Sequence, residues 1–150
     1  MHYDLVIHNG MIVTVNDDFE TIPSGMICVK DGRIARVASV SPETPLPDST
    51  SVIDAEKGIV IPGLVNTHTH LPMTLFRGLA DDLPLMEWLN DHIFPAEAKH
   101  INPASVKAGA LLGCAEMLLS GTTTCCDGYF LESRVAEAVE QSGMRAVLAQ

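Results

Sequence analysis

The sequence predicts a mixed α/β protein in two parts, a strand-rich segment at residues 1–57 and alternating strands and helices at residues 58–150. The first part is predicted because short apolar runs alternate with turn dipeptides. The second is predicted because apolar runs of strand length alternate with longer stretches of helical periodicity. Hydrophobic residues make up 47% of the 150-residue chain, which is enough to build a buried core.

The first segment is expected to form a small antiparallel β unit. Asn9-Gly10 and Asp31-Gly32 each lie between two apolar runs. Both dipeptides can adopt the positive φ angles that a two-residue hairpin loop requires. We therefore expect two hairpins, followed by a surface loop at residues 41–51, which are rich in Pro, Ser and Thr.

The second segment is expected to run in the order strand, helical region, strand, helix, strand, with two successive helices in the first helical region. Pro95 should interrupt the first helix because proline has no backbone N–H. Asn102 and Pro103 suit the start of the next helix, and Gly121 suits its end. The expected strands are residues 63–67, 122–126 and 145–149, and the expected helices are residues 85–93, 103–120 and 131–142.

Strands that alternate with helices predict a parallel sheet, either open and doubly wound or closed as a (β/α)8 barrel. Periodicity alone does not choose between the two arrangements. A closed barrel needs about 250 residues, so residues 58–150 could hold only its first units. Because the sequence ends in an apolar strand, we expect a truncated domain, and if that domain is a barrel it requires the remainder of the barrel.

Charge and apolar patterning exclude several classes of partner. The formal net charge of -10 is unsuited to a nucleic-acid backbone, and no apolar run approaches the roughly 18 residues that a membrane helix needs. The N-terminus lacks the basic flank of a secretory signal, so a cytoplasmic protein is expected. The cysteines form no C-x-x-C pair, which argues against structural zinc bound through sulfur: Cys28, Cys114, Cys125 and Cys126.

The sharpest chemical feature is His68-Thr69-His70, directly after the first strand expected in the second segment. Residues i and i+2 of a strand project to the same side, so both imidazoles can converge on one divalent ion. A merely structural histidine pair is the alternative. The position favours metal ligation, because parallel β/α enzymes collect their active-site groups at the carboxyl ends of strands.

The surrounding residues resemble a known family. Residues 62–78 read PGLVNTHTHLPMTLFRG, and residues 81–89 read DDLPLMEWL. This block closely resembles the 5-methylthioadenosine/S-adenosylhomocysteine deaminases of the amidohydrolase superfamily. The resemblance extends over the whole chain, since the strand-rich start is similar to the family's N-terminal β-sandwich segment and residues 120–124 are similar to its second barrel strand.

The resemblance implies the N-terminal part of a (β/α)8 TIM barrel preceded by a small β-sandwich segment. It implies one divalent metal, zinc or iron, with His68 and His70 as two ligands. Glu97 matches the position at which the family holds the ribose hydroxyls of a nucleoside. The remaining ligands and the proton-transfer residues would lie beyond residue 150, so these 150 residues alone should be inactive.

The implied activity is hydrolytic deamination of an adenine nucleoside, 5-methylthioadenosine or S-adenosylhomocysteine, with release of ammonia by an enzyme that is a homo-oligomer. A guanine-type or triazine hydrolase and a noncatalytic barrel scaffold are the alternatives. A self-standing α/β binding domain is a further one, which would require the chain to be a compact monomer.

Other residues could contribute to the site. Trp88 could stack on a base, although its helical spacing equally suits the core, and Glu97 could instead be an exposed partner of Lys99. Asp127 follows the second strand of the second segment, where it could bind a ligand or cap a turn. Three charged residues in the loop after the histidines could order that loop, steer substrate or simply be surface charge: Arg77, Asp81 and Asp82.

Overall fold

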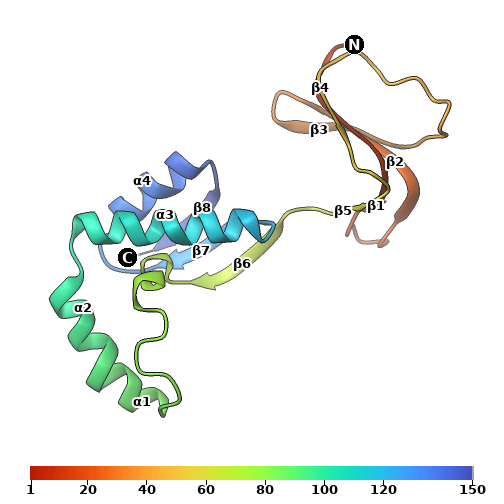
Figure 1. Cartoon of the computed structure of the whole chain (residues 1–150). Helices are drawn as coiled ribbons and strands as arrows, with labels where there is room; N and C mark the ends of the chain where they lie inside the picture. Colours follow the sequence, from red (N-terminus) through yellow and green to blue (C-terminus); the bar gives the residue numbers. More distant parts are fainter. Residues whose placement is uncertain (150) are drawn as a thin grey trace. The chain divides into compact units, whose positions relative to one another are not determined.

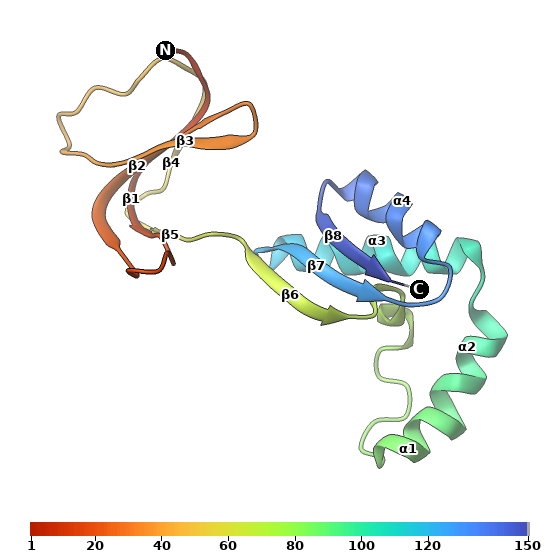
Figure 2. The ribbon, with the colours of Figure 1, turned by 180° about the vertical axis from the view of Figure 1, so that it is seen from behind.

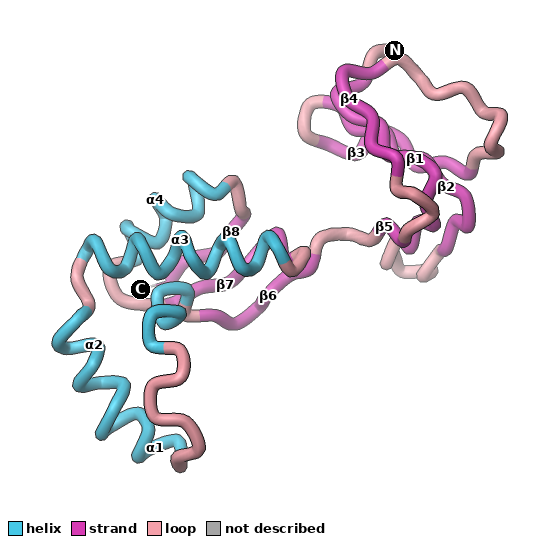
Figure 3. Tube along the Cα trace, viewed as in Figure 1, coloured by secondary structure: helices cyan, strands magenta, loops and turns pink. Residues whose placement is uncertain are grey.

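The computed structural model describes residues 1–149, and Gln150, the last residue of the predicted second segment, lies outside the described part. The chain divides into two compact units, Met1–Pro62 and the residues from Gly63 onward. The first contains strands and loops, and the second alternates strands with helices (Figures 1 and 3). The predicted mixed α/β class is confirmed.

The first unit is one mixed sheet. Its central strand β1 pairs antiparallel with β2 and parallel with both β4 and β5, while β3 pairs antiparallel with β2. The prediction of a purely antiparallel unit is therefore wrong for the last two strands. The strands are β1 (Tyr3–Val13), β2 (Thr21–Lys30), β3 (Arg33–Ser39), β4 (Ser49–Asp54) and β5 (Ile59–Val60).

One of the two predicted hairpins is present. Asp31 and Gly32 have φ angles of 50° and 69° and join β2 to β3 as expected. Asn9 also has a positive φ, 57°, but it lies inside the continuous strand β1, where the pairing with β2 shifts between Ile7 and Gly10. The Asn9-Gly10 hairpin is thus wrong, because the same backbone preference serves a β-bulge within one strand.

The boundary between the units lies slightly later than the sequence suggested. β5 was expected within residues 58–150, but it extends the first sheet by pairing Met11 with Ile59 and Ile12 with Val60. The assignment of residues 1–57 as a β-sandwich segment and residues 58–150 as barrel units stays a prediction.

The second unit is a parallel sheet in the order β6-β7-β8. Figures 1 and 2 show α3 and α4 together on one face of this sheet. The predicted order of elements and the parallel sheet are confirmed. The elements are β6 (Leu64–Thr69), η1 (Leu71–Phe76), α1 (Leu85–Glu87), η2 (Trp88–Ile93), α2 (Phe94–His100), α3 (Pro103–Leu119), β7 (Thr122–Gly128), α4 (Glu132–Ser142) and β8 (Arg145–Ala149).

The core of this unit lies between the sheet and the two helices. Its fully buried members come from η1, α3, β7 and α4, and include Leu71, Val106, Cys114, Cys125 and Val135. On the opposite face of the sheet, Val65 and Val147 are 59% and 65% exposed, respectively.

The helix expected to stop at Pro95 instead continues through it. The chain runs from α1 through the π-helical turn η2 into α2, and Pro95 lies in the first turn of α2. A proline ring clashes with the carbonyl one α-helical turn earlier. The wider π turn, in which the Phe94 N–H donates to the Leu89 carbonyl, directly precedes that position and accommodates the ring.

The start of α3 agrees with the sequence. Asn102 is the N-cap, its side chain accepts hydrogen bonds from the N–H groups of Ala104 and Ser105, and Pro103 occupies the first helical position. Gly121 follows the helix with a φ of 85°. Among residues 1–149, no helix combines the length and apolar character needed to cross a membrane.

Candidate functional site

The histidine pair lies where β6 ends. His68 is the next-to-last residue of β6, and His70 is the N-cap residue of η1. Their ring centroids are 5.2 Å apart, and the ring planes are inclined at 80°. The two imidazoles are thus brought together at the carboxyl end of the strand, while their role as metal ligands stays a prediction.

A hydrogen bond determines how His70 could act. Its Nδ1 lies 2.6 Å from the carbonyl oxygen of Gly128 at the end of β7. A carbonyl oxygen can only accept, so Nδ1 donates and a neutral ring keeps its lone pair on Nε2. This is the arrangement in which metal-binding histidines are usually oriented.

The donor set fits part of a zinc-type site. Two neutral imidazole nitrogens suit a divalent cation such as zinc or iron. Within residues 1–149, no group of three or more His, Cys, Asp or Glu side chains is arranged to hold a metal ion. The histidine pair by itself therefore offers two candidate ligands.

Behind the histidines lies a buried pair of acids. Asp127 is 4% exposed, and its Oδ1 accepts a hydrogen bond from the backbone N–H of Leu71 at 2.6 Å. Glu132, in the first turn of α4, is 7% exposed. In the described part of the chain, Asp127 Oδ2 and both carboxyl oxygens of Glu132 have no hydrogen-bond partner within normal geometry.

Burial controls the charge of this pair. Desolvation raises the pKa of Asp127 above its ordinary range, although the hydrogen bond from Leu71 opposes the shift. Desolvation, reinforced by the charge of Asp127, raises the pKa of Glu132 to about 7. Glu132 was not singled out from the sequence, because an acid in the first turn of a helix is typical of a solvated residue that favours the helix dipole.

Next to His70 is a cavity of about 560 Å³ within the second unit. Glu97 of α2 lines it and is only 8% exposed, so the alternative of an exposed partner for Lys99 is wrong. The hydroxyl of Tyr129 donates a hydrogen bond to Glu97 Oε1 at 2.6 Å. Most of the other lining side chains are apolar, among them Met73, Leu89, Ile93 and Phe94.

Tyr129 is a residue that sequence reasoning missed. It lies just beyond β7, and no local pattern links it to a glutamate 32 residues earlier. Burial and the hydrogen bond to Glu97 raise its pKa, so the phenol is protonated and acts as a donor. Only its position beside a strand end, where functional residues gather in β/α folds, could have drawn attention to it.

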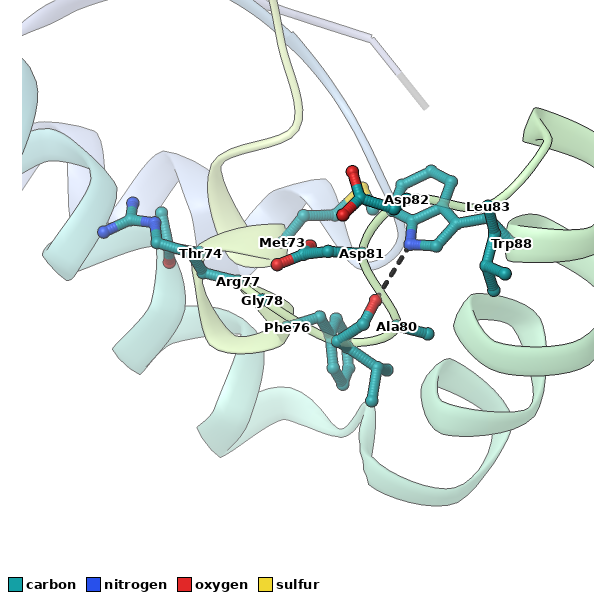
Figure 4. Close-up of a pocket in the computed structure, with 11 residues that line it drawn as sticks. Met73, Thr74, Phe76, Arg77, Gly78, Ala80, Asp81, Asp82, Leu83 and Trp88 are labelled. Carbon is teal, nitrogen blue, oxygen red and sulfur yellow. Dashed lines mark hydrogen bonds between the residues drawn. The ribbon is translucent and has the colours of Figure 1, made fainter.

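Trp88 lies at the cavity wall, and its stacking on a base stays a prediction. It is partly buried and lines the cavity together with His70 and Glu97. Its indole N–H donates to the backbone carbonyl of Leu79 at 3.0 Å, as drawn in Figure 4. This hydrogen bond ties the loop before α1 to η2 and holds the indole at the cavity wall.

The charged residues of that loop lie in two different surroundings. Arg77 points away from Trp88 in Figure 4 and forms a two-pronged ion pair with Glu116 of α3, with N–O distances of 2.6 and 2.8 Å. It therefore orders the loop against α3. Asp81 and Asp82 line a separate hollow of about 470 Å³ beside Trp88 (Figure 4).

Comparison with known proteins identifies relatives that cover almost the whole chain. A 5'-deoxyadenosine deaminase from Methanococcoides burtonii is 48% identical over 145 residues, which are 97% of this chain and 32% of the relative. A 5-methylthioadenosine/S-adenosylhomocysteine deaminase from Syntrophobacter fumaroxidans is 49% identical over 147 residues, 98% of this chain and 33% of the relative. The chain thus spans about a third of the length of the curated relatives it matches.

A solved structure supports the same relationship. An adenosine deaminase from Xanthomonas campestris with bound zinc superimposes with a TM-score of 0.92 and 38% sequence identity, covering 97% of this chain and 33% of that structure. The sequence model of the Amidohydrolase family matches residues 59–150, which include both histidines, Glu97 and Tyr129. The chain belongs to the amidohydrolase family.

Proposed function

We propose that this chain is the N-terminal part of a metal-dependent enzyme that hydrolytically deaminates an adenine nucleoside. The observation that carries the proposal is the pair His68 and His70, whose rings lie 5.2 Å apart beside a cavity that contains the buried carboxylate of Glu97. The names of the similar deaminases favour 5'-deoxyadenosine, 5-methylthioadenosine or S-adenosylhomocysteine as substrate.

The residues present would have different roles, some in metal binding and others in nucleoside binding. His68 and His70 would hold a divalent metal, zinc first and iron second, through neutral imidazole nitrogens. Glu97 would accept hydrogen bonds from ribose hydroxyls, and Trp88 and the apolar wall would contact the rest of the nucleoside. When bound, a divalent cation lowers the pKa of water toward ~7 and so supplies a nucleophile at neutral pH.

The remainder of the site is assigned to the rest of the protein. Deamination also needs a group that accepts the proton of water and a group that protonates the departing amine. We propose that these groups lie on later strands of a (β/α)8 barrel, which would also cover the exposed side chains of Val65 and Val147. The homo-oligomeric state and the cytoplasmic location stay predictions from the sequence.

The test is an assay of the full-length protein loaded with zinc. We expect ammonia release from at least one of the three nucleosides, and loss of both bound zinc and activity in the His68→Ala/His70→Ala variant. A matched control is His2→Ala, since His2 lies in the first unit, where it contacts Asp48. That variant should keep its zinc and its activity.

Two results would overturn the proposal. Turnover of guanine or a triazine, with none of the three adenine nucleosides consumed, would assign the chain to a different hydrolase. Unchanged zinc content in the double histidine variant, measured by elemental analysis, would favour the noncatalytic scaffold.

A further inference from the structure

One short segment at the end of β7 contacts both halves of the proposed site. The Gly128 carbonyl accepts a hydrogen bond from His70 Nδ1 at 2.6 Å, and the hydroxyl of the next residue, Tyr129, donates to Glu97 Oε1 at 2.6 Å. The rings of His70 and Tyr129 have centroids 6.4 Å apart. Two consecutive residues therefore connect a candidate metal ligand to the carboxylate proposed to bind sugar.

The carboxylate of Glu97 needs such a partner. Glu97 is 8% exposed in a cavity with mainly apolar walls, and a glutamate side chain has three rotatable bonds. A hydrogen bond to an ionised group is stronger than one between neutral groups and is sensitive to direction. The Tyr129 hydroxyl thus restricts the orientation of the carboxylate and engages one of its two oxygens.

We infer that Tyr129 is a positioning residue for nucleoside recognition: it holds Glu97 so that Oε2 is presented to the ribose hydroxyls of the substrate. This inference rests on the proposed function of the chain. Because Gly128 orients His70, the same segment would set the spacing between the sugar and the reacting end of the base. The selected substrates are nucleosides that carry an intact ribose diol.

The inference is tested in the full-length zinc-loaded protein with two matched substrates, adenosine and 2',3'-dideoxyadenosine. We expect Tyr129→Phe to raise the KM for adenosine about tenfold, the effect of losing one hydrogen bond to a charged group, with little change in kcat. The KM for dideoxyadenosine should not change, because that substrate lacks the 2'- and 3'-hydroxyls that Glu97 is proposed to bind. The zinc content should also remain the same.

Two further variants separate positioning from a general structural effect. Tyr3→Phe makes the same chemical change at a buried tyrosine of the first unit and should alter neither KM. In a Glu97→Gln background, Tyr129→Phe should add no further loss for adenosine, because the residue acts through Glu97. The double variant also removes the unpaired carboxylate, so it remains informative if Tyr129→Phe alone folds poorly.

The outcomes distinguish the inference from the function on which it rests. If Glu97→Gln loses affinity for adenosine but Tyr129→Phe does not, the positioning role of Tyr129 is overturned and the proposed function stands. An equal change in KM for both substrates in Tyr129→Phe would likewise overturn it. If the wild-type protein turns over no adenine nucleoside, the proposed function itself fails.

Discussion

Asp127, near the end of β7, accepts a hydrogen bond at 2.6 Å from the backbone N–H of Leu71, the residue that follows His70. The same two strand ends are paired through Thr69 and Asp127 in the sheet register. A side chain from one strand thus fixes the point at which the neighbouring strand, carrying both histidines, turns into η1.

Removing this acceptor should destabilise the protein. Asp127→Ala would leave a buried N–H at Leu71 without a partner, and we expect the free energy of unfolding to fall by about 1–3 kcal/mol. Asp127→Asn keeps an oxygen acceptor and should recover part of the loss. Urea denaturation of the full-length protein measures both changes; an alanine variant as stable as the wild type would contradict this role.

Glu132 should make stability fall as the pH rises. Its pKa is raised from 4.5 to about 7 by burial beside Asp127, so the folded state keeps the proton longer than the unfolded state. The resulting stability is present below about pH 4.5 and is lost as the pH rises through about 7.

Replacing the Glu132 carboxyl by a neutral amide removes the loss of stability that its ionisation causes. Glu132→Gln should therefore be more stable than the wild type at pH 8, by about 1–2 kcal/mol, with little difference at pH 5. Thermal unfolding at the two pH values tests the sign. The exposed Glu140 of the same helix provides the control, since Glu140→Gln should show no such difference between the two pH values.

Gly109 of α3 lets η1 approach the helix closely. A Cβ at this position would lie 2.7 Å from the Pro72 carbonyl oxygen and 2.9 Å from Leu75 Cγ. Gly109→Ala should force η1 away from α3 and lower stability by about 1–3 kcal/mol. Ala108→Ser, on an exposed position of α3, should be neutral by the same denaturation assay; equal stability of the two variants would show that η1 shifts freely.

Two cysteines should be protected from alkylation. Cys114 and Cys125 are fully buried in the core of the second unit, and burial raises the pKa of both thiols, that of Cys125 to about 11. Since the thiolate is the reactive form, iodoacetamide at pH 8 should leave both unmodified in the native protein and modify them in urea. Peptide mapping by mass spectrometry measures modification at each cysteine. Rapid alkylation of Cys125 in the native protein would show that solvent and reagent reach this core.

Much of the second unit was predictable from local patterns. Asn102 and Gly121 have side-chain and backbone properties that define helix ends, so α3 is located by the residues themselves. The histidine pair was found in the same way, because alternation along a strand places residues two apart on one side. These features depend on interactions within a few residues of each other.

Two predictions from the sequence were wrong because the local preference of a residue is compatible with more than one structure. The surrounding elements decide which structure forms. Asn9 has a left-handed conformation that suits a hairpin, yet its strand continues because β2 and β4 pair with it on either side. Pro95 would end an isolated α-helix, yet the π turn η2 precedes it and the helix continues. In both cases a local preference was satisfied in a way that neighbouring structure selected.

By itself, the sequence determined the α/β class, the order of elements from β6 to β8, and the pair His68 and His70 at a strand end. Only the tertiary structure decided that Glu97 is buried and bound by Tyr129, and that Asp127 holds Leu71 with Glu132 nearby. The physical reason is the sequence separation of the interacting residues. Helix caps and strand alternation arise between near neighbours in the sequence. The burial and charge of a carboxylate depend instead on residues that folding brings close from distant parts of the chain.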